Sequence, residues 1–151
     1  MNPDLETLGK RAVACPRWRW MPGMAAIYEA NHSLTDKHSG MAVQVTEIRL
    51  VAEAFVICEP EHRFAEVSIL LNGKTRSYGS LFTKDLTPDL SDPATVGCLL
   101  ALVREAWPSN GMESVSAHHS HAQKWLIDLP GKVICGDTEA EALVAALEAA
   151  P

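Results

Sequence analysis

The sequence predicts an α+β fold in which a central helix over residues 93–107 and a C-terminal helix over residues 138–149 pack on an antiparallel sheet. Two observations support it: apolar residues recur at helical spacing in those two segments, and β-branched segments separated by turn residues precede and lie between them. A chain of 151 residues with 47% hydrophobic and 21% charged residues has the size and composition of one globular domain. We therefore expect a single soluble domain over residues 1–151.

The N-terminal segment divides into a short helix up to Cys15 and a stretch, PRWRWMP, that two prolines exclude from helical structure. In an extended chain, its two tryptophans share one face and its two arginines the other. These residues are Arg17, Trp18, Arg19 and Trp20. Either the tryptophans cover the core and the arginines are solvated, or the tryptophans form a stacking platform for a base or nucleotide.

The segment MAVQVTEIRLVAEAFVIC, residues 41–58, is rich in β-branched residues and long enough for one bent strand or two. Val43 and Val45 follow one alternation, whereas Ile48 and the apolar residues after it follow the opposite one. The change of phase predicts a β-bulge or a break near Thr46 and Glu47.

A hairpin is predicted around Asn72-Gly73, because this dipeptide between two strand-like segments favours a two-residue type I′ turn. The turn sets the facing pairs: Leu71 with Lys74, Ile69 with Arg76, and Val67 with Tyr78. One face of the hairpin then mixes apolar and basic side chains. It is either a half-exposed edge whose basic side chains lie over apolar neighbours, or a surface for a ligand or partner.

The central helix has recognisable limits, because Asp92 can cap it, Pro93 fits its first turn and Pro108 ends it. Its expected apolar stripe consists of Val96, Leu99, Leu100, Val103 and Trp107, and Cys98, Ala101 and Leu102 widen it, so we expect much of its circumference to be covered.

Residues 121–150 predict a β-β-α unit. The strand AQKWLIDL is followed by a turn at Pro130-Gly131, the strand KVIC, and a helix whose capping box is Thr138 with Glu141. The apolar stripe of this helix is Leu143, Val144 and Leu147.

Composition indicates the compartment and the chemistry of a partner. No signal peptide or membrane span is evident, and Cys15, Cys58, Cys98 and Cys135 are far apart, so we expect reduced core thiols in a cytoplasmic protein. The net charge is −6, yet ten of the thirteen basic residues and nine of the nineteen acidic ones lie in residues 1–84. Any surface that binds anions is therefore expected in the first half of the chain.

Three histidines, His118, His119 and His121, lie within four positions. If this segment is a strand, His119 and His121 present two imidazoles to one side, and a catalytic zinc would need a third protein ligand. A surface loop rich in serine and histidine explains the same residues without a metal. Because no motif for nucleophilic catalysis, nucleotide binding or metal binding is present, we predict no cofactor and no catalytic residue.

Two resemblances follow from short blocks of sequence. The blocks KRAVACPRWRWMPGM, DLSDPATVGCLLALVREAW and GDTEAEALVAALEAAP resemble a family of small phage and prophage proteins of unknown function from Proteobacteria. Residues 25–85 lack that resemblance, so we expect them to be an elaboration of the family's fold. The resemblance implies a phage genome and a bacterial host cell, and no particular chemistry.

The segment IDLPGKVICGDTEAEALVAALEAA is similar to part of the HicB-type antitoxins, whose hairpin-and-helix domain binds a small ribonuclease toxin. The matching positions are Asp128, Leu129, Pro130, Gly131, Gly136, Asp137, Thr138, Glu141, Ala142 and Leu143. They are turn, cap and core residues, so the similarity supports the local fold more than the function.

These observations favour a non-catalytic phage accessory protein that binds a host or phage protein, such as a component of host defence, or a small anionic or nucleotide ligand. The expected recognition residues are Arg17, Trp18, Arg19, Trp20, Lys74, Arg76 and Tyr78. A metal-dependent enzyme built on the histidines and a HicB-like antitoxin are the alternatives. A nucleic-acid partner and self-association stay open, and no membrane partner is expected.

Overall fold

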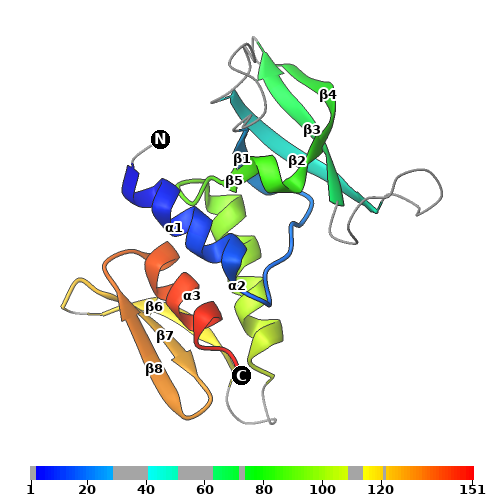
Figure 1. Ribbon diagram of the computed structural model, residues 1–151. Coiled ribbons are helices and arrows are strands. Elements are labelled where there is room, and N and C mark those ends of the chain that lie inside the picture. The colour runs from blue at the N-terminus through cyan, green and yellow to red at the C-terminus, as the bar shows by residue number, and fades with distance from the viewer. Residues whose placement is uncertain (1–2, 29–40, 51–62, 72–73, 109–113, 121) are drawn as a thin grey trace. The chain divides into compact units, whose positions relative to one another are not determined.

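The computed structural model describes residues 3–28, 41–50, 63–71, 74–108, 114–120 and 122–151 (Figure 1). Their helices and antiparallel strands confirm the α+β class. The chain forms two compact units: a terminal unit, Met1–Arg19 with Leu90–Pro151, and an inserted unit, Trp20–Asp89. The expectation of one domain stays a prediction.

The inserted unit is built on a five-stranded sheet whose order is β4-β3-β2-β1-β5 (Figure 1). All neighbouring strands are antiparallel. The elements are β1 (Ala25–Tyr28), β2 (Met41–Leu50), β3 (Arg63–Leu71), β4 (Lys74–Phe82), the 3₁₀ helix η1 (Thr83–Asp85) and β5 (Leu86–Pro88). Among the described strands, β4 and β5 form the edges of this sheet.

The β2 strand contains the bulge that the sequence predicts. Val45 pairs with Val67, but the next pair is Glu47 with Glu66, so Thr46 is an additional residue on β2. The Thr46 hydroxyl donates a hydrogen bond to the carbonyl of Glu66 at 2.9 Å. The additional residue shifts the alternation of β2 by one position, as the change of phase in the sequence predicts.

The β3–β4 register confirms two of the three predicted pairs. Leu71 pairs with Lys74 and Ile69 pairs with Arg76, whereas Val67 pairs with Gly79 rather than with Tyr78. Tyr78 is an extra residue of β4 at a second bulge, next to Gly79 with a φ of 131°. A side chain is rarely tolerated at this φ, so glycine suits the position. The predicted turn residues 72 and 73 lie outside the described part of the chain.

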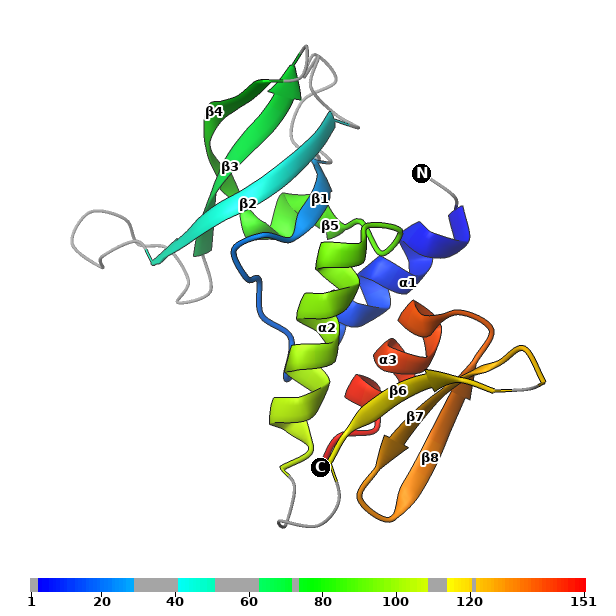
Figure 2. The ribbon, with the colours of Figure 1, turned by 180° about the vertical axis from the view of Figure 1, so that it is seen from behind.

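The terminal unit combines three helices with a three-stranded antiparallel sheet of order β6-β7-β8 (Figures 1 and 2). Its elements are α1 (Pro3–Ala14), α2 (Pro93–Ala106), β6 (Ser116–His119), β7 (Trp125–Leu129), β8 (Lys132–Gly136) and α3 (Glu139–Glu148). Helix α3 covers one face of the sheet and also packs against α1 and α2. The predicted pairing of a C-terminal helix with an antiparallel sheet is therefore present.

The helix starts agree with the sequence. The Asp92 carboxylate accepts a hydrogen bond from the Thr95 amide at 2.8 Å, and Thr138 and Glu141 form the expected capping box. The buried residues of α3 include the predicted stripe of Leu143, Val144 and Leu147. The buried residues of α2 are Thr95, Leu99, Leu102, Val103 and Ala106, of which Leu99, Leu102 and Val103 belong to the predicted apolar face.

Two predicted strands differ from the structure. The segment PRWRWMP is irregular, because a turn follows α1 and the Trp18 amide donates to the Cys15 carbonyl at 2.9 Å. The strand expected from residue 122 begins only at Trp125, because residues up to Lys124 form a turn in which Gln123 has a φ of 58°. Residues 116–119, before this turn, form β6.

Candidate binding surfaces

The arginines of the N-terminal segment are engaged within the chain. Arg19 donates two hydrogen bonds to the Glu105 carboxylate, at 2.5 and 2.7 Å, and this contact lowers the pKa of Glu105 from its ordinary value. Arg17 donates to the carbonyl of Pro151 at 2.9 Å. Both guanidinium groups therefore have partners, and a ligand would have to displace or share them.

Both tryptophans of this segment are at least partly buried. Trp20 is 8% exposed and Trp18 is half-buried. This burial agrees with the alternative in which the tryptophans cover the core. Arg17, Trp18 and Arg19 belong to the terminal unit, whereas Trp20 and the predicted residues of β4 belong to the inserted unit.

Lys74 and Arg76 form a pair that we call the basic edge. They occupy alternate positions of the edge strand β4, so their side chains leave the same face of the sheet. Both are exposed, as are Thr75 and Ser77 between and after them. Tyr78, the third predicted residue of this hairpin, is half-buried.

The basic edge differs from the other cationic side chains that the structure describes. Four ion pairs join Lys10 to Glu6, Arg11 to Glu148, Arg19 to Glu105 and Lys124 to Asp137. Arg17 and Arg104 donate to the carbonyls of Pro151 and Val115, and the ammonium groups of Lys84 and Lys132 lie over the rings of Phe82 and Trp107. Among the basic residues whose side chains the structure describes, Lys74 and Arg76 are the two without such a partner in the described part of the chain. No described acidic side chain neutralises these two charges.

The two histidines that the structure describes, His118 and His119, are neighbours on β6. His118 Nδ1 lies 3.3 Å from Asp128 Oδ2, while the ring of His119 meets the edge of Trp125 at 5.6 Å between centroids. These two histidines are consecutive on a strand and leave opposite faces. His121 lies outside the described residues, and among the described ones no three histidine, cysteine or acidic side chains form a group suited to a metal ion.

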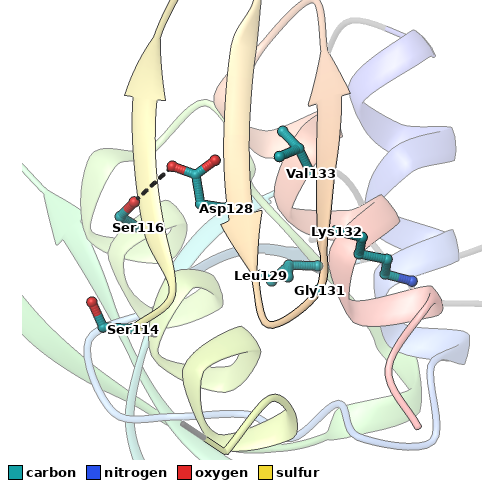
Figure 3. A pocket seen from close by; sticks show the side chains of 7 residues that line it. All are labelled: Ser114, Ser116, Asp128, Leu129, Gly131, Lys132 and Val133. Carbon is teal, nitrogen blue, oxygen red and sulfur yellow. Dashed lines mark hydrogen bonds between the residues drawn. The ribbon is translucent and has the colours of Figure 1, made fainter. Parts of the chain in front are cut away.

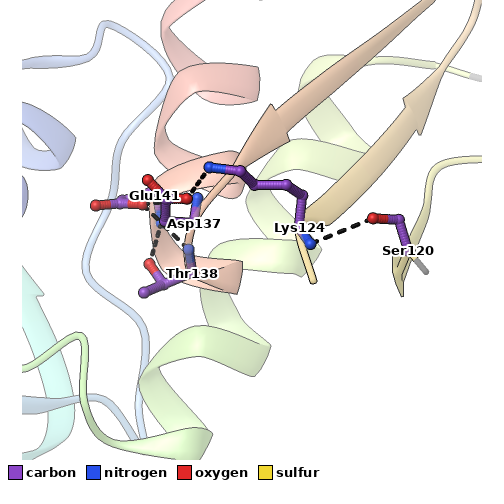
Figure 4. A network of polar contacts seen from close by, with 5 residues as sticks. All are labelled: Ser120, Lys124, Asp137, Thr138 and Glu141. Atoms are coloured by element: carbon purple, nitrogen blue, oxygen red, sulfur yellow. Dashed lines mark hydrogen bonds and ion pairs between the residues drawn. The ribbon is translucent and has the colours of Figure 1, made fainter. Parts of the chain in front are cut away.

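The N-terminus of α3 is held by the network drawn in Figure 4. The amides of Asp137 and Thr138 donate to Glu141 Oε2 at 2.9 and 3.1 Å, and the amide of Glu141 donates to Thr138 Oγ1 at 3.1 Å. Lys124 forms an ion pair with Asp137, which raises the lysine pKa. The chain itself thus supplies acceptors to the first backbone donors of the helix, as a capping box does.

The cysteines differ in burial, which corrects the expectation of core thiols. Cys15 is buried and Cys98 is half-buried, and burial is the main cause that raises the pKa of each thiol. Cys135 is exposed at the edge strand β8 and is therefore not a core residue. All three are free thiols, and Cys58 lies outside the described residues.

Comparison with known proteins finds no match for the chain among family models, curated proteins or solved structures. Among the helices described, none has both the length and the apolar character needed to cross a membrane.

Proposed function

We propose that the chain is a non-catalytic phage accessory protein that acts in the bacterial cytoplasm by binding an acidic, extended segment of a host or phage protein. The observation that carries this proposal is the basic edge, where Lys74 and Arg76 are exposed on an edge strand without an ion pair among the described residues. The phage setting rests on the sequence blocks described above.

The geometry of the basic edge suits a segment rather than a small ion. Edge strands have unpaired backbone groups on one side, and many proteins use them to add a strand from a partner. Side chains two residues apart on a strand are separated by about 6.6 Å, so acidic residues at alternate positions of an extended segment have the same spacing. The two positive charges also disfavour pairing of β4 with β4 of a second copy, because like charges repel.

The test measures binding of an acidic strand-forming peptide, acetyl-(Val-Glu)₄-amide, by the full-length protein. We expect the double change Lys74→Ala, Arg76→Ala to weaken binding by about tenfold or more, since charged anchors of this kind contribute about 1–3 kcal/mol each. Raising the salt concentration should weaken binding by the unchanged protein, because exposed charges are screened.

The matched control is Lys10→Ala, Lys84→Ala, which removes the same charge from side chains that have partners within the chain. It should leave the affinity within about twofold, because it does not touch the basic edge. If both double variants weakened binding equally, the affinity would depend on the net charge of the protein alone, and the proposal would be wrong. Co-purification from infected cells, compared between the two variants, would then identify the natural partner.

A further inference from the structure

Described residues line a pocket on the face of the three-stranded sheet opposite α3. Along β7, Ile127 and Leu129 are buried, whereas Asp128 between them leaves the other face. The register places Ser116 of β6 and Val133 of β8 on either side of Asp128, so these three residues form a row on that face. In the terminal unit, the described helices all lie away from it (Figures 1 and 2).

A pocket of about 600 Å³ lies along this row and is drawn in Figure 3. Its lining residues are Ser114, Ser116, Asp128, Leu129, Gly131, Lys132 and Val133. Val133 is 59% exposed, which makes it the most exposed large apolar side chain of the described residues. The Lys132 ammonium lies 4.6 Å from the centroid of the Trp107 ring, so its charge has another partner and is directed away from Asp128.

Asp128 keeps one carboxylate oxygen available in this pocket. The Ser116 hydroxyl donates to Oδ2 at 3.1 Å, and His118 Nδ1 lies 3.3 Å from the same oxygen. Figure 3 shows the second oxygen directed away from Ser116. No described residue forms a hydrogen bond or an ion pair with that oxygen, Oδ1. The contacts to Oδ2 hold the carboxylate in place, and Oδ1 is left as an acceptor.

We infer that this pocket binds an arginine side chain of a partner protein. A guanidinium group donates hydrogen bonds in a planar fork that fits a carboxylate, and its aliphatic stem can lie over an apolar neighbour such as Val133. The acidic character of residues 85–151, which carry ten acidic and three basic side chains, favours the approach of a cation. The inference concerns the terminal unit and does not depend on the basic edge of the inserted unit.

The carboxylate at the centre of the pocket distinguishes this site from the one that the sequence predicts. An anionic ligand would meet Asp128, whereas a cation gains a charge-assisted hydrogen bond at Oδ1. A lysine side chain offers a compact charge without the planar fork, so it should bind less tightly than arginine.

The test titrates ¹⁵N-labelled full-length protein with acetyl-Ala-Arg-Ala-amide and follows the amide resonances. We expect the largest shifts at Ser116, Asp128 and Val133. Acetyl-Ala-citrulline-Ala-amide, which has nearly the same shape without the charge, should bind at least about tenfold more weakly, as should the arginine peptide to the Asp128→Asn variant, because a hydrogen bond between charged groups is lost. The lysine peptide should lie between the arginine and citrulline peptides.

Two further variants distinguish an effect at the pocket from a change in net charge and from unfolding of the protein. Asp137→Asn removes the same charge from an exposed carboxylate of the same unit and should leave the affinity within about twofold. Val133→Lys places an ammonium opposite Asp128 on an exposed position and should abolish binding while the spectrum of the folded protein is retained. Absence of shifts at the three residues, equal binding of the lysine or citrulline peptide, or full binding by Val133→Lys or Asp128→Asn would overturn the inference.

Discussion

Gly136 lies at the end of β8, where the strand runs against the backbone of α3. A Cβ atom added at this position would lie 2.6 Å from the amide nitrogen of Ala142 and 3.0 Å from the carbonyl oxygen of Thr138. Backbone atoms of a packed helix cannot move aside without disturbing the core. Gly136→Ala should therefore lower the free energy of unfolding by about 1–3 kcal/mol, measured by urea denaturation.

Gly97 provides the matched control for that change. It lies inside α2, and a Cβ added there meets nothing within 4 Å. Because alanine favours helix more than glycine does, Gly97→Ala should raise the free energy of unfolding by about 0.5–1 kcal/mol. The same glycine-to-alanine change should thus lower the free energy of unfolding at residue 136 and raise it at residue 97. If Gly136→Ala raised the free energy of unfolding, the close approach between Gly136 and the backbone of α3 would be wrong.

Individual site residues could be predicted from the sequence only where a local pattern determined their surroundings. Lys74 and Arg76 follow from the turn signal at residues 72–73, which sets the hairpin register from its closed end. The engagement of Arg19 could not be predicted, because its partner Glu105 lies 86 positions away. Asp128 had a signal, since it interrupts an apolar strand, but its row with Ser116 and Val133 depends on strand pairing.

At the scale of secondary-structure elements, the capping box at the start of α3 offers a direct test. Thr138→Ala removes the oxygen that accepts from the Glu141 amide, and such a loss at an N-cap costs about 0.5–2 kcal/mol. Thermal unfolding should show a lower midpoint for Thr138→Ala, whereas Thr138→Ser, which keeps the hydroxyl, should restore most of it. An unchanged midpoint for the alanine variant would contradict the role of the cap.

Helices could be predicted more completely than strands because caps and periodicity are local. Asp92, Pro93 and the capping box determine where α2 and α3 begin, and each lies within four residues of its partner. The β4 register changes at Gly79, where the backbone adopts a positive φ that glycine permits but does not by itself reveal. Strand β6 has no strong local signal, and its pairing with β7 across a turn defines it.

At the scale of the whole molecule, composition and length predict one domain, whereas the contacts divide the chain into two compact units. The division could not be predicted from composition, because apolar and polar residues are distributed similarly in both units. Residues 25–85 lack the resemblance to the phage protein family and are therefore expected to be an elaboration. They lie within the inserted unit, Trp20–Asp89.

The inserted unit begins and ends on neighbouring strands, which makes its removal a test of independence. Ala26 pairs with Pro88, and the Asp89 amide donates to the Ala25 carbonyl at 3.0 Å. Replacing residues 25–88 by a short glycine-serine linker should therefore leave the terminal unit folded, as insertions whose ends are close can often be exchanged. The check is whether the amide resonances of α2, α3 and the three-stranded sheet keep their positions; a collapsed, poorly dispersed spectrum would count against it.

The terminal unit consists of two separate parts of the sequence, so its first helix is synthesised well before the elements that it packs against. Arg11 on α1 and Glu148, joined by two hydrogen bonds, are 137 positions apart. With translation at about 5–20 residues per second, α1 emerges on the order of ten seconds before the α3 residues it packs against. During that interval Leu8 and Ala12, both buried in the finished fold, lack the cover of α3. Helix α1 can therefore complete its packing only after α3 has been made, whereas all five described strands of the inserted unit precede α2 in the sequence.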